Sequence, residues 1–172
     1  MAKYKYSFKK FFTTVPFTYV IADSKFVTNG YFVVKRDYLR KPQNDFIKTD
    51  TKIFNSGKHT EEYIEKVYEV FKQAQETAKQ EDSTEFIPVY LGTECDKNTT
   101  KPYKVVMAKD YKCIKEEYYN FFKDIKGEIF YHPTLQKHIP LPVYRNNEMI
   151  GLIFPVIPHK SLHDNTKYKE VI

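Results

Sequence analysis

Residues 17–36 read FTYVIADSKFVTNGYFVVKR, and this stretch decides the class of fold. Its apolar and β-branched runs are separated by turn-forming residues, which is typical of short strands. Asn29-Gly30 predicts a two-residue type I′ turn, because both central positions of that turn need a positive φ. We therefore expect antiparallel hairpins here, with one strand running from Tyr31 to Lys35.

The chain has 172 residues, which is long enough for a domain with its own core. Its 15 Tyr and 14 Phe exclude a disordered chain, and its 2 Cys exclude a disulfide scaffold. No apolar run approaches the ~20 residues of a membrane helix, and we expect no secretion signal at the N-terminus. We expect a cytoplasmic domain over 1–158, undivided or built from halves 1–96 and 97–158, and a polar tail over 159–172.

The net charge of +6 combines regions of opposite sign. Residues 1–58 carry +8, residues 59–96 carry −7 and residues 97–172 carry +5. Such asymmetry steers association with a charged partner, although charged runs are also common on ordinary solvated surfaces. Both interpretations stay open at this point.

Two amphipathic helices are expected, over 60–78 and 115–125, because their apolar residues recur every three or four positions. Residues 37–58 and 92–102 are polar and are expected to be loops. The other expected strands span 86–91, 103–108, 129–131, 141–145 and 149–154, the last two forming a hairpin around Asn146-Asn147. The fold class is therefore α+β, with antiparallel β hairpins and two amphipathic helices.

The outward face of the first helix is acidic. Glutamates in its first turn favour the helix dipole, and the later ones recur along one side. These candidate partner-binding residues are Glu61, Glu62, Glu65, Glu69 and Glu76.

Residues 3–12 mix lysines with aromatic side chains. The spacing of Tyr4, Tyr6 and Phe8 has the period of two that is typical of a strand. The segment is either an edge strand whose rings enter the core or a surface that stacks on single-stranded nucleic acid.

Few residues form a pattern typical of catalysis. Asp96 and Asp110-x-Lys112 are compatible with an acidic pair and a lysine that hold Mg²⁺ at a phosphodiester, or with an ordinary charged strand end. His159 and His163 have the i,i+4 spacing of a helical metal site, but no third ligand lies beside them. We expect no catalytic residue, no metal and no cofactor.

Two segments carry a resemblance to a known family. Residues 19–35, with their Thr-Asn-Gly turn, and residues 148–156, EMIGLIFPV, resemble the sliding clamps of bacteria and phages, the beta-subunit family of DNA polymerase III. The β-α-β-β-β order expected over 103–156 is similar to the repeating unit of that family. The resemblance implies a role in DNA replication, and the chain is too short to close a ring alone.

A third segment is similar to the short peptide that binds such clamps: a glutamine, a spacer, an acidic residue and two bulky apolar residues. In that family the apolar pair fills a pocket and the glutamine makes polar contacts. The alternative is a loop whose apolar residues enter the protein's own core. The residues are Gln43, Asp45, Phe46 and Ile47.

We therefore expect a non-catalytic phage-type protein that binds the bacterial sliding clamp and uses the acidic helix to block its access to DNA or polymerase. One alternative is a small clamp-like processivity factor that binds duplex DNA, and another is a metal-dependent nuclease. Exposed strand edges can pair with a second copy of the chain, so a homodimer stays an alternative. The basic residues available to bind DNA are Lys3, Lys5, Lys9, Lys10, Lys35, Arg36, Arg40 and Lys41.

Overall fold

The computed structural model describes residues 6–13, 21–22, 25–49, 60–78, 83–95, 101–133, 139–157 and 168–171. These residues form a mixed α+β fold with two antiparallel sheets, which confirms the predicted class.

The larger sheet has seven strands, and every pair is antiparallel. Its central pair joins β3 to β10, with Val34 opposite Gly151, so strands from the two halves of the chain share this sheet. In spatial order the strands are β1 (Ile21–Ala22), β2 (Phe26–Thr28), β3 (Phe32–Lys35), β10 (Glu148–Ile153), β9 (Leu141–Arg145), β8 (Glu128–Tyr131) and β4 (Thr84–Glu85).

The smaller sheet has four strands: β11 (Tyr168–Glu170), β5 (Pro88–Cys95), β6 (Pro102–Ala108) and β7 (Cys113–Lys115). Two sequence predictions are wrong here. The loop expected over 92–102 is wrong at its start, because β5 continues to Cys95 along β6. The expected polar tail contains β11, which pairs with β5 through Lys169 opposite Leu91.

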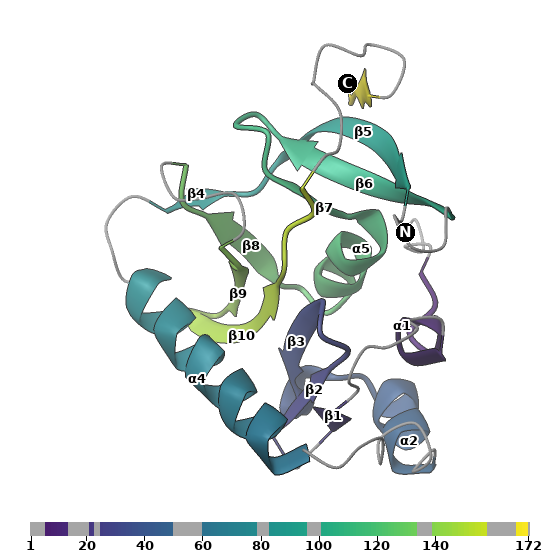
Figure 1. Cartoon of the computed structure of the whole chain (residues 1–172), viewed down its shortest axis with the longest axis vertical. Helices are drawn as coiled ribbons and strands as arrows, with labels where there is room; N and C mark the ends of the chain where they lie inside the picture. Colours follow the sequence, from purple (N-terminus) through teal and green to yellow (C-terminus); the bar gives the residue numbers. More distant parts are fainter. Residues whose placement is uncertain are drawn as a thin grey trace.

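The helices are α1 (Lys10–Thr13), the 3₁₀ helix η1 (Arg36–Tyr38), α2 (Lys41–Thr49), α4 (Thr60–Ala78) and α5 (Glu116–Asp124). Both predicted amphipathic helices are present as α4 and α5. Figure 1 shows α4 lying along the larger sheet, with α2 and α1 near the N-terminal strands and the smaller sheet at the other end of the molecule.

The main core lies on the α5 side of the larger sheet. Phe121 and Phe122 of α5 are fully buried there and pack among aromatic rings that include Phe32. Phe122 lies so close to β10 that a Cβ on Gly151 would come within 2.6 Å of its ring. Glycine at 151 therefore permits the close approach of α5 to the sheet.

The other face of the sheet is covered by α4. Phe71 of α4 is buried, and its ring lies 4.8 Å from that of Phe26 on β2. Val33 of β3 and Met149 and Leu152 of β10 belong to the same smaller apolar cluster, with Tyr68 of α4 packed against it. Burial of one side of the helix thus fixes which side faces solvent.

The hairpin between β2 and β3 differs from the predicted type I′ turn. Gly30 has a φ of 87°, but Asn29 is not among the residues with positive φ. Asn29 is instead fully buried, and its Oδ1 accepts hydrogen bonds from the backbone N–H groups of Tyr31 and Phe32. Its Nδ2 donates to the Tyr118 hydroxyl at 2.9 Å, so this side chain connects the turn to α5.

The second hairpin follows the prediction. Arg145 lies opposite Glu148, and the two residues between them, Asn146 and Asn147, have φ values of 50° and 63°. Two central residues with positive φ are the geometry of a type I′ turn.

The N-terminal segment is not the expected edge strand, because within residues 6–13 it forms a turn and then α1. Its rings nevertheless enter the core: Phe8, Phe11 and Phe12 are buried. Their spacing of three and four residues is helical, which explains the difference.

The clamp-like unit is not confirmed. The strands before α5, β6 and β7, pair with each other in the smaller sheet. The strands after it, β8, β9 and β10, belong to the larger sheet. The order is therefore β-β-α-β-β-β, divided between two sheets.

Candidate protein-binding surface

The exposed face of α4 carries four glutamates on one side. Each residue turns an α-helix by about 100°, so these positions fall within a sector of roughly 60°, and the first and last are separated by about 21 Å along the axis. The side chains are solvent-exposed in each case. We call these residues the acidic stripe: Glu62, Glu65, Glu69 and Glu76. Glu61 lies in α4 as well, but its side chain falls outside the described part of the structure.

Basic partners among the described residues neutralise only part of the charge of the stripe. The Nζ of Lys66 lies 3.3 Å from Oε1 of Glu62, an exposed i,i+4 pair that is screened by water. Within the described residues, Glu65 and Glu76 form no salt bridge. The stripe therefore presents negative potential on a helix that is anchored through its opposite side.

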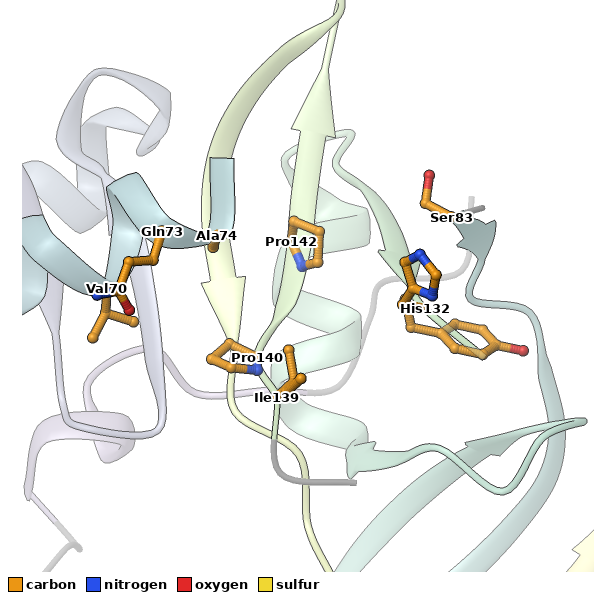
Figure 2. Close-up of a pocket in the computed structure, with 9 residues that line it drawn as sticks. Val70, Gln73, Ala74, Ser83, His132, Ile139, Pro140 and Pro142 are labelled. Carbon is orange, nitrogen blue, oxygen red and sulfur yellow. The ribbon is translucent and has the colours of Figure 1, made fainter. Parts of the chain in front are cut away.

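An apolar pocket adjoins the same helix. It has a volume of about 230 Å³ and lies between α4 and the ends of β8 and β9 (Figure 2). We call it the α4 pocket, and it is lined by Val70, Gln73, Ala74, Ser83, Tyr131, His132, Ile139, Pro140 and Pro142.

A second, more polar hollow of about 510 Å³ lies towards the β9–β10 turn. Its aromatic residues are Phe130 and Tyr144, whose rings are 5.7 Å apart in an edge-to-face arrangement. Burial raises the pKa of Tyr144 above its ordinary value. Ser83 lines both hollows, which places them on one continuous part of the surface.

The segment that resembles a clamp-binding peptide is not an accessible loop. It lies in α2, where Ile47 is 5% exposed and Gln43 is 8% exposed. Phe46 packs against the rings of Phe8 and Phe12. The apolar side chains that a clamp would bind thus lie in the protein's own core, whereas Asp45 pairs with Lys41 at 2.6 Å.

Gln43 has a structural role instead. Its Oε1 accepts from the backbone N–H of Arg40 at 2.8 Å, and its Nε2 donates to the Tyr6 hydroxyl at 3.2 Å. The Tyr6 hydroxyl in turn donates to Asp124 at 2.5 Å. Burial and this hydrogen bond raise the pKa of Tyr6, and the network joins the N-terminal segment, α2 and α5.

Several residues of the predicted DNA-binding set already have acidic partners. Lys35 lies 2.6 Å from Glu148, and Arg40 lies 2.9 Å from Asp124. The hydrogen bond from Lys35, followed by that from Tyr38, lowers the pKa of Glu148, so this carboxylate stays ionised beside the lysine. Local pairing reduces the charge that these side chains offer to phosphates.

The other basic candidates are distributed differently. Lys9 and Lys10 are exposed beside the buried rings of the N-terminal segment, and Arg36 is partly exposed in η1. Lys3 and Lys5 lie outside the described residues.

Of the nuclease-like residues, the structure describes Asp110 and Lys112. Asp110 follows β6 just after Ala108, whereas the residue before Asp96, Cys95, lies opposite Pro102 at the other end of that strand. A strand of this length separates its ends by roughly 20 Å. Asp96 itself lies outside the described residues.

The described member of that pair has a different contact. The Tyr131 hydroxyl donates to Asp110 at 2.6 Å, and burial together with this bond raises the pKa of Tyr131 to about 12. Lys112 is 6% exposed. In the described ranges, no group of three or more His, Cys, Asp or Glu side chains is arranged to hold a metal ion. His159 and His163 lie outside those ranges.

Comparison of the chain with protein-family models, with curated proteins and with solved structures finds no match. No helix among the described residues is both long and apolar enough to cross a membrane.

Sequence reasoning identified the acidic face but missed the pocket beside it. The pocket is formed by residues that are distant in sequence, such as Val70 and Ile139, and no periodicity connects them. The one local signal was the pair of prolines at 140 and 142, which interrupts hydrogen bonding along β9.

Proposed function

We propose that this chain is a non-catalytic, phage-type protein of DNA replication that binds the bacterial sliding clamp and blocks its access to DNA or polymerase. The observation that carries the proposal is the acidic stripe on α4. Because the apolar side of the helix is packed on the larger sheet, the carboxylates are held outward on a rigid element.

The mechanism is electrostatic competition. Sliding clamps, which the sequence resembles, present lysine and arginine to DNA phosphates without reading sequence. A row of carboxylates about 21 Å long offers such a basic surface an alternative set of anions. Association of this kind is steered by long-range attraction and weakens as salt is added.

The test compares charge reversal on the stripe with matched charge reversal elsewhere. The stripe variant carries Glu65→Lys, Glu69→Lys and Glu76→Lys. The control variant carries Asp37→Lys, Glu117→Lys and Glu170→Lys, whose native side chains are also exposed. Both variants change the net charge equally, so a non-specific effect of total charge is the same in each.

We expect calorimetry with a purified bacterial sliding clamp to show binding by the native chain and the control. The stripe variant should bind at least about tenfold more weakly, since exposed ion pairs contribute ~0.2–1 kcal/mol each and reversal adds repulsion. Absence of binding by the native chain, or equal binding by all three, would overturn the proposal. Tight binding to duplex DNA with a steep salt dependence would favour the processivity-factor alternative.

A further inference from the structure

The α4 pocket exists because two strands separate. β8 and β9 are paired at Glu128 with Tyr144 and at Ile129 with Val143, and their pairing ends there. Pro142, the next residue towards the start of β9, has no N–H to donate to β8. β8 instead continues beside β4, so a gap opens at this fork and α4 borders it.

The walls of the pocket are apolar. Figure 2 shows Val70 and Ala74 of α4 on one side and Ile139 and the two prolines on the other, with His132 and Ser83 beyond them. Its volume of about 230 Å³ is below the roughly 300–1,000 Å³ of pockets for drug-sized molecules. The pocket therefore suits a single apolar side chain better than a cofactor.

The charge beside the pocket indicates which residues should neighbour the apolar side chain of a bound segment. Gln73 lines the pocket, and its Nε2 donates to Oε1 of Glu69 at 3.2 Å, which places the stripe at the pocket's rim. Glu76 lies three residues, about one helical turn, after Gln73 on the same side of α4. The described side chains that line the pocket include no lysine or arginine.

We propose that the α4 pocket receives one apolar side chain from a protein segment whose neighbouring lysines or arginines pair with Glu69 and Glu76. This inference rests on the proposed function, because it assigns the basic partner of the stripe an anchor residue. The charges attract and orient the segment, and burial of the anchor adds on the order of ten- to hundredfold in affinity.

The experiment uses two acetylated pentapeptides as probes. One has phenylalanine between two pairs of lysines, and the other has serine at that position. Each is titrated into the full-length ¹⁵N-labelled protein, and amide shifts are followed. We expect both peptides to shift α4 resonances, and the phenylalanine peptide to bind at least tenfold more tightly and to shift Ala74 and Ile139.

Variants of the protein test whether the tighter binding of the phenylalanine peptide arises in the α4 pocket. Ile139→Asp places a charge in the pocket and should abolish the advantage of the phenylalanine peptide. Ala74→Leu, which reduces the pocket volume, should do the same if the first variant folds poorly. Ile157→Asp is the matched control at an exposed isoleucine outside the pocket, and it should leave the advantage intact.

Three outcomes would overturn the inference: equal affinity of the two peptides, no shifts with either peptide, or an advantage that survives both pocket variants. Each is distinguishable from failure of the proposed function, which is judged by binding to the clamp. Dimerisation of the native chain that Ile139→Asp abolishes would instead assign the pocket to a second copy.

Discussion

The two amphipathic helices occupy opposite faces of the larger sheet and serve different purposes. In α5, Tyr118, Phe121 and Phe122 are at most 3% exposed, and the helix belongs to the main core. Among the described side chains of α4, only Phe71 is buried. Similar patterns of apolar residues thus produce one helix that builds the core and one that covers a smaller cluster while exposing a row of glutamates.

The largest expected effect is on stability, and it separates the two helices. Phe121→Ala in α5 should lower the free energy of unfolding by about 3–5 kcal/mol, because it leaves a cavity among fully buried rings. Phe71→Ala in α4 removes the same group from a smaller cluster and should cost at least ~1 kcal/mol less. Urea titration measures both values, and equal losses would show that the faces are energetically equivalent.

The next effect concerns the side chain that joins α5 to the first hairpin. Asn29→Ala should cost about 2–3 kcal/mol, since it leaves the part-buried N–H of Tyr31 and the buried N–H of Phe32 without their acceptor. Asn120→Ala, on a partly exposed position of α5, is the matched control and should stay within about 0.5 kcal/mol. A loss below ~1 kcal/mol for the first variant would contradict this role of Asn29.

The smallest effect is a pH dependence on the α4 side of the sheet. Lys35 pairs with Glu148, and its Nζ lies 5.7 Å from the ring centroid of Phe71. Because the folded state lowers the pKa of Glu148, the pair stabilises the fold above the unfolded pKa of about 4.3 and loses this effect as pH falls through the folded pKa.

The contribution should be below ~1 kcal/mol, because the Glu148 side chain is 51% exposed. Glu148→Gln should therefore reduce the stability difference between pH 7 and pH 3, measured by urea titration. Glu128→Gln, at an exposed carboxylate of the same sheet, is the control and should keep the native difference. An unchanged difference in the Glu148 variant would exclude a stabilising pair.

The sequence predicted the regular elements whose own pattern determines them. The 3.6-residue period gave both α4 and α5, and Asn146-Asn147 marked a turn that has the expected positive φ values. The acidic face of α4 followed directly, because packing of the apolar side leaves the glutamates outside.

Other features depended on contacts that are distant in sequence. The turn pattern predicts a positive φ at Asn29, but the side-chain amide of Asn29 donates to Phe11 and Tyr118, which are 18 and 89 residues away. The predicted loop over 37–58 is wrong across α2, because Pro42 is compatible with the first turn of a helix. The α4 pocket depends on the divergence of β8 and β9, for which the prolines at 140 and 142 are the one local signal.

Hydrogen exchange of the protein with and without a bacterial sliding clamp tests the central claim most directly, because it reports both helices in one experiment. We predict that amides of α4, over Thr60–Ala78, gain protection at saturating clamp, whereas those of α5, over Glu116–Asp124, exchange at an unchanged rate. Protection confined to α5 or to the basic N-terminal segment, or no change at any amide, would contradict the account.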